Sequence, residues 1–201
     1  MDNRLSFSKN IATVTRACRF CLYNIRRIRP FLTTYSTQLL VQAMVLSRLD
    51  YCNSLLAGLP ASAIRPLQLI QNAAARLVFN VPRHSHVTPL LSNLHWLPVM
   101  ARIKFKTLVL EYQAVKGSAP VYIQSLIKTY TPTRPLCSAT SCRLAPPPRH
   151  TCTSCSRLVS VLVPRWWNDL PVDVRTAESL TSFKRISSGC TFPSLTHNHR
   201  D

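Results

Sequence analysis

Apolar residues recur at helical spacing along most of the first 128 residues. Between residues 8 and 28 they lie three or four apart, which places them on one stripe of a helix that Pro30 ends. The stripe consists of Ile11, Val14, Cys18, Cys21, Leu22, Ile25 and Ile28. Four arginines occupy the other side of this predicted helix: Arg16, Arg19, Arg26 and Arg27. The pattern predicts an amphipathic helix with a basic outer face.

Further helices complete one predicted helical core over about residues 8–128. One spans 36–49, one begins near Pro66 and ends near 79, one covers 88–94, and a longer one runs from Pro98 to Gly117. A short helix after Pro120 reaches 127. The residues expected to face inward in the three longer helices are Leu39, Leu40, Ala43 and Met44; Leu67, Ile70, Ala74, Leu77 and Val78; and Val99, Ile103, Thr107, Leu110 and Ala114.

The helical pattern breaks after residue 128. Residues 129–157 are rich in Pro, Ser and Arg and predict a linker without a core of its own. Residues 158–187 predict a small C-terminal segment with one short extended stretch at 158–163 and a helix from about Thr176, and 188–201 predict a disordered tail. The expected fold class is therefore mostly α, a bundle-like helical domain at 1–128 followed by this linker, segment and tail.

Charge limits the choice of partner. The chain has 25 Lys and Arg against 7 Asp and Glu, a net charge of +18. Nucleic acid is the polyanion that most often neutralises such a surplus, and an anionic membrane surface is the second. The chain has no run of 18 or more apolar residues, so no membrane-spanning helix is predicted. Eight Cys without a secretory signal favour reduced thiols inside the cell, whether nuclear or cytoplasmic. From the charge we expect RNA or DNA as the partner, bound weakly, and no membrane.

The acidic residues are too few and too scattered for a polymerase site. Two-metal nucleotidyl transfer needs convergent carboxylates, and none of the seven acids is adjacent to another. No glycine-rich phosphate loop is present either, since the chain has three Gly. We therefore expect no catalytic residues, no cofactor and no enzymatic activity.

Three groups of residues leave other interpretations open. Cys137, Cys142, Cys152 and Cys155 lie in the basic linker near His150, and their spacing permits a zinc site but fits it loosely. Zinc is therefore kept as an alternative, and the expectation is that none is bound. His84, His86 and His95 are more typical of loop and structural histidines than of ligands. Trp166 and Trp167 could stack on bases, but their apolar flanks favour core packing of at least one.

Several stretches are more specific than generic helices. They are Ser47-Arg-Leu-Asp-Tyr-Cys-Asn-Ser-Leu-Leu56, Gln71-Asn-Ala-Ala-Ala-Arg-Leu77, Leu94-His-Trp-Leu-Pro98 followed by Arg102-Ile-Lys-Phe-Lys106, Arg165-Trp-Trp-Asn-Asp-Leu-Pro171 and Ala177-Glu-Ser-Leu-Thr-Ser-Phe-Lys184. In this order they resemble the region after the palm in the reverse transcriptase polyprotein of LINE-type, non-LTR retrotransposons related to jockey. The resemblance covers about residues 2–185.

This resemblance implies a thumb-side helical domain that contacts template, primer or element RNA and performs no chemistry. The rest of the reverse transcriptase would be its partner in an intact element. Two departures, the linker cysteines and the ending at 187–193, favour a decayed genomic copy, so an inert fragment without a partner is a further alternative. The candidate phosphate contacts are Arg16, Arg19, Arg26, Arg27, Arg102, Lys104 and Lys106.

Overall fold

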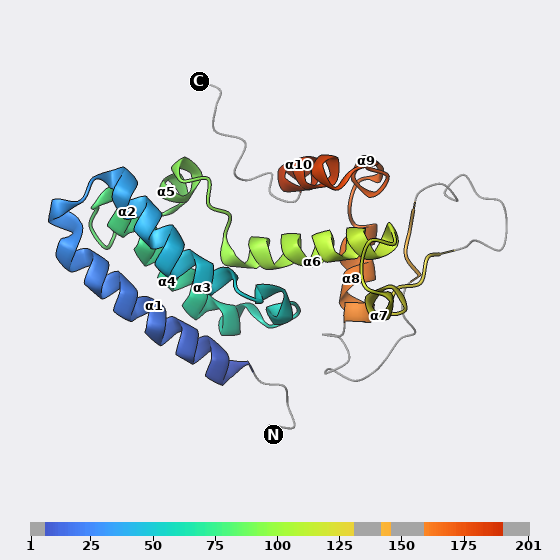
Figure 1. Ribbon diagram of the computed structural model, residues 1–201, viewed down its shortest axis with the longest axis horizontal. Coiled ribbons are helices and arrows are strands. Elements are labelled where there is room, and N and C mark those ends of the chain that lie inside the picture. The colour runs from blue at the N-terminus through green and yellow to red at the C-terminus, as the bar shows by residue number, and fades with distance from the viewer. Residues whose placement is uncertain (1–6, 131–141, 146–158, 191–201) are drawn as a thin grey trace. The chain divides into compact units, whose positions relative to one another are not determined.

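The computed structural model describes residues 7–130, 142–145 and 159–190, and these residues are mostly helical (Figure 1). The mostly α class is confirmed. Outside the helices, Thr129 and Leu144 form one antiparallel bridge. The chain divides into two compact units, an N-terminal unit of residues 1–103 and a C-terminal unit of residues 104–201.

The N-terminal unit is a set of packed helices. Its elements are α1 (Ser8–Ile28), a 3-10 turn (Arg29–Phe31), α2 (Thr34–Val41), a π-helical turn (Gln42–Leu46), α3 (Ser47–Asp50), a second 3-10 turn (Asn53–Leu56), α4 (Ala61–Phe79), α5 (Thr88–Asn93) and the start of α6 (Val99–Val115). Helix α1 packs along α4, and α2 also packs on α4. The apolar core lies between these helices.

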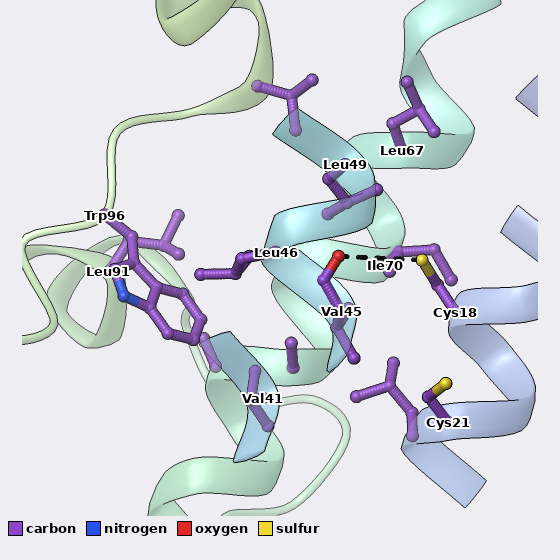
Figure 2. Packing of buried hydrophobic residues seen from close by; sticks show 14 of the residues in the cluster. Cys18, Cys21, Val41, Val45, Leu46, Leu49, Leu67, Ile70, Leu91 and Trp96 are labelled. Atoms are coloured by element: carbon purple, nitrogen blue, oxygen red, sulfur yellow. Dashed lines mark hydrogen bonds between the residues drawn. The ribbon is translucent and has the colours of Figure 1, made fainter. Parts of the chain in front are cut away.

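Helix α1 has the bounds and the buried stripe that its sequence predicts. Cys18, Cys21 and Ile25 are buried in the core of the N-terminal unit, whereas Ile28 is exposed. The Cys18 thiol donates a 3.9 Å hydrogen bond to the Val45 carbonyl, as Figure 2 shows. Burial, together with the neighbouring Cys21, raises the pKa of Cys18 to about 11. A thiol that stays protonated is a poor metal ligand and nucleophile, so Cys18 is unsuited to either role. Cys18 and Cys21 are both buried and act as small core residues.

The inward face predicted for residues 36–49 is wrong. Leu39, Ala43 and Met44 are exposed, and of the four predicted residues Leu40 alone is partly buried against the core. The residues that face the core recur every four positions: Thr37, Val41, Val45 and Leu49. The π-helical turn explains this spacing, because its extra residue keeps positions four apart on one side of the helix.

Helix α4 buries the predicted stripe but begins earlier than predicted. Its buried residues include Leu67, Ile70, Ala74, Leu77 and Val78. Pro60 precedes the helix, and Pro66 lies inside it rather than in its first turn. The helix ends where Asn80 adopts the left-handed conformation, with φ 52°.

The C-terminal unit contains the rest of α6 and four shorter helices. These are α7 (Val121–Gln124), α8 (Val159–Asn168), α9 (Val172–Arg175) and α10 (Leu180–Cys190). Tyr112 of α6 stacks on Phe183 of α10 with ring centroids 4.5 Å apart, and Trp167 stacks on the same ring at 6.0 Å. This aromatic cluster forms the centre of the second core.

Three expectations for this half of the chain are corrected. The stretch expected to be extended at 158–163 is helical from Val159 onward, because Val163 and Trp167, four residues apart, both face the core. Leu110 is exposed rather than inward. The single core expected over 8–128 is divided within α6, because the residues of α6 after Ile103 pack with the C-terminal helices. Leu144, which lies in the expected linker, belongs to this second core.

Candidate nucleic-acid interface

The outer face of α1 combines arginines with aromatic rings. Arg16, Arg19, Arg26 and Arg27 are all exposed. Phe20 and Tyr23 lie among them, and their side chains are 66% and 60% exposed. The apolar face of the helix is buried, so packing against α4 is what turns these six side chains outward.

Arginines from four segments line two adjoining cavities in the N-terminal unit. The first, of about 490 Å³, lies between α1 and α4 and is lined by Arg19, Tyr23, Arg26, Arg76 and Arg83 together with apolar residues. The second, of about 670 Å³, also contains Arg26, Arg76 and Arg83 and adds Arg29 and Asn80. Because the cavities share three arginines, we treat them as one site. The arginine groove is defined by Arg19, Arg26, Arg29, Arg76 and Arg83.

Two of these arginines hold the groove together. Arg29 donates from Nε to the Leu77 carbonyl at 3.2 Å and from Nη2 to the Val78 carbonyl at 3.0 Å. Its cation thereby satisfies carbonyls at the C-terminus of α4, where positive charge is favoured. Arg76 donates from Nε to the Ser85 carbonyl at 3.1 Å, which ties the loop after α4 to the helix.

The other three arginines are exposed and available to a ligand. Within the described part of the chain, no hydrogen bond or ion pair engages the side chain of Arg19, Arg26 or Arg83. None of the described acidic residues lines either cavity. An uncompensated cluster of guanidinium groups attracts anions, and phosphate matches the geometry of the guanidinium fork.

Acidic groups are almost absent from this unit. Between residues 3 and 103 the sequence has Asp50 as its one acid. The Asp50 carboxylate is bound by Arg102, with 2.7 Å between Nη1 and Oδ2. The charge of the groove is therefore not neutralised from within the described residues of the unit.

The other candidate cations do not join the groove. Arg102 is held by Asp50 and by the Leu97 carbonyl, to which its Nε donates at 3.0 Å. Lys104 is half-buried in the C-terminal unit, with its Nζ 5.9 Å from the centre of the Trp166 ring. Lys106 is half-buried and has an interaction partner. Of the seven predicted contacts, Arg19 and Arg26 line the groove, and Arg16 and Arg27 lie on the outer face of α1.

Sequence reasoning missed Arg29, Arg76 and Arg83. Helical periodicity shows which side of α4 is apolar, but it does not show that α4 packs beside α1. The usable signal is weak: Arg76 is the one charged residue in the motif Gln71-Asn-Ala-Ala-Ala-Arg-Leu77, so its side chain is expected at the edge of the apolar face.

The metal and stacking candidates fall outside this site. Cys142 is exposed, and Cys137, Cys152 and Cys155 lie outside the described residues. In the part of the chain that the structure describes, no group of three or more His, Cys, Asp or Glu could hold a metal ion. His84, His86 and His95 are all exposed.

The two tryptophans have structural environments. Trp167 is fully buried, and its Nε1 donates to the Cys142 carbonyl at 2.8 Å. Trp166 is half-buried beside Lys104. Trp167 is thus unavailable to nucleic acid, and core packing of at least one tryptophan is confirmed.

Comparisons with known proteins supply no relative. Neither a protein-family model, nor a curated protein, nor a solved structure matches the chain. Among the described residues, no helix is both long enough and apolar enough to cross a membrane.

Proposed function

We propose that this chain is a non-catalytic, C-terminal segment of a LINE-type reverse transcriptase that binds RNA or DNA through the arginine groove. The groove itself carries the proposal: five arginines from α1, α4 and the adjoining turns and loops line it, and none of the described acids does. Phosphate contacts of this kind give affinity without reading sequence. The remaining parts of the polyprotein would supply the polymerase chemistry.

Two further features support a role in binding rather than catalysis. The ordered motifs that resemble the post-palm region lie on the helices that build the groove and its neighbours, including Gln71-Asn-Ala-Ala-Ala-Arg-Leu77 on α4. Among the described acids, Asp50 is paired with Arg102 and Glu111 is buried, while Asp169, Asp173 and Glu178 are exposed without forming a metal-binding group. We therefore expect no metal-dependent nucleotide incorporation by the purified chain.

The test compares two variants that lose the same charge. One changes Arg19, Arg26 and Arg83 to Gln in the groove, and the other changes Arg48, Arg165 and Lys184 to Gln elsewhere. All six side chains are exposed, so neither variant opens a core cavity. Circular dichroism verifies that both remain folded.

Binding of a labelled single-stranded RNA is then measured over a range of salt concentrations. Each lost phosphate contact lowers the slope of log affinity against log salt by roughly 0.7 for a single strand. We expect the groove variant to lose about two such steps and the control variant less than one. Equal losses would mean diffuse attraction to a highly charged chain, and the fragment without a specific partner would replace the proposal.

A further inference from the structure

An exposed pair of aromatic rings stands at the edge of the arginine groove. Phe20 and Tyr23 are three residues apart on α1, so their side chains are neighbours on the helix surface, with about 5–6 Å between Cβ atoms. Neither belongs to the buried core or to the partly buried residues packed against it. A single exposed ring needs no explanation, but two adjacent rings bordered by four arginines form a distinct surface.

Tyr23 links the rings to the phosphate-binding chemistry. It lines the same cavity of about 490 Å³ as Arg19, Arg26, Arg76 and Arg83. A strand whose phosphates contact these arginines would therefore pass close to the ring of Tyr23. Phe20 continues the apolar surface one helical turn toward the N-terminus of α1.

Stacking distinguishes one form of nucleic acid from another. In a duplex the faces of the bases are covered by neighbouring base pairs, so an exposed ring on a protein surface finds no face to contact. In a single strand the faces are accessible, and aromatic side chains in a basic groove bind them without sequence preference. Resting on the proposed function, we infer that the groove takes single-stranded nucleic acid, with bases stacked on Tyr23 and Phe20.

An anionic membrane surface fits the same side chains less well. Helices that lie on membranes insert their apolar face, but the apolar face of α1 is buried against the core. In addition, Arg76 lines the wall of the groove that α4 forms, and a flat lipid surface would have to enter a concavity to reach it. Chain-like phosphate ligands meet no such obstacle.

The experiment uses the full chain and one RNA of roughly 12 nucleotides, either single-stranded or annealed to its complement. The variants are Phe20→Ala with Tyr23→Ala, the ring-preserving Tyr23→Phe, and the control Tyr51→Ala. Tyr51 is 80% exposed in the same unit and does not line the groove. Because all three positions are exposed, we expect each variant to keep its helical content by circular dichroism.

We expect the double alanine variant to lose roughly tenfold or more in affinity for the single strand, since stacking of one base contributes on the order of one such factor. Its affinity for the duplex and its salt slope should stay unchanged, and Tyr23→Phe and Tyr51→Ala should bind like the unchanged protein. Equal binding of both RNA forms, or a double variant that binds the single strand normally, would overturn the inference.

The two proposals fail in distinguishable ways. If the groove arginines alter the salt slope but the rings have no effect, nucleic-acid binding by the groove stands and the single-strand inference falls. If the groove arginines behave like the control cations, the proposed function falls as well. Loss of binding to vesicles of anionic phospholipid in the double variant, with RNA binding intact, would assign the surface to membranes and overturn the inference.

Discussion

The two units treat buried polar groups differently. In the N-terminal unit the fully buried Gln71 donates from Nε2 to the Leu97 carbonyl at 2.8 Å. Two buried side-chain atoms of this unit, Asn53 Oδ1 and Trp96 Nε1, have no hydrogen-bond partner among the described residues, and both are neutral. The C-terminal unit buries Glu111 and Arg175, which are 2% and 3% exposed, and in the described part of the chain nothing bonds to Glu111 Oε1 or to Arg175 Nε and Nη1. Among the described residues, the N-terminal unit buries no charged side chain, whereas the C-terminal unit buries two.

This difference has energetic and functional consequences. Burying an ionised group without a partner costs several kcal/mol, and the protein avoids part of that cost by shifting the pKa. Burial raises the pKa of Glu111 to about 7 and, with nearby Arg143, lowers that of Arg175. We therefore expect the stability of the C-terminal unit to vary with pH, whereas the uncharged polar side chains buried in the N-terminal unit should add no such dependence.

The largest expected effect comes from removing the centre of the aromatic cluster. Trp167→Ala removes a fully buried ring and the donor to the Cys142 carbonyl, so it should destabilise the C-terminal unit by about 3–5 kcal/mol. Amide hydrogen exchange should show lost protection in α8 and α10 with α1 and α4 still protected. Trp166→Ala, at a half-buried position, is the control and should cost less. If Trp167→Ala reduced protection equally in both units, the two units would unfold together rather than independently.

The next largest effect concerns pH. The pKa of Glu111 rises from 4.5 to about 7 on folding because its carboxyl is buried, so the folded state holds a proton that the unfolded state releases. The stability due to this group is complete below pH 4.5, falls as pH rises toward 7, and amounts to about 3 kcal/mol. Denaturant titrations between pH 5 and 8 should show the C-terminal unit weakening with rising pH. Glu111→Gln should flatten this dependence, and an unchanged profile would refute the assignment.

A smaller effect is expected from the buried amide of the N-terminal unit. Gln71→Leu removes the donor to the Leu97 carbonyl, which still accepts a hydrogen bond from Arg102. We therefore expect a loss of about 1–2 kcal/mol, read from the denaturation midpoint of α1 and α4. Because Gln71 does not titrate, this loss should be the same at pH 5 and pH 8. A loss that varies with pH would undermine the contrast between the units.

The smallest effect is expected from the ion pair between Arg102 and Asp50 in the N-terminal unit. Arg102→Gln breaks the contact with Asp50, but both side chains are partly exposed, so the cost in stability should be about 1 kcal/mol or less. The salt slope of RNA binding should stay unchanged, because Asp50 already occupies this guanidinium. If this salt slope fell by the amount expected for one lost phosphate contact, Arg102 would have to contact the nucleic acid after all.

The sequence by itself determined those features that depend on one helix at a time. The bounds and buried stripe of α1, the stripe of α4 and the positive φ of Gly117 at the end of α6 follow from apolar spacing and from residues that stop helices. The mostly α class follows from the same signals. Local periodicity is reliable there because a helix with one apolar face has only one way to bury it.

Tertiary structure alone decided which faces meet. Residues 34–50 offer more than one apolar stripe, and the π-helical turn together with packing on α1 and α4 selected the one containing Val41 and Val45. The packing of α1 beside α4 places Arg19 and Arg26 in the same cavity as Arg76. The ion pair with Asp50 makes Arg102 a poor candidate for a phosphate contact. Such groupings join residues far apart in the chain, and their distances are set by packing rather than by any local pattern of residues.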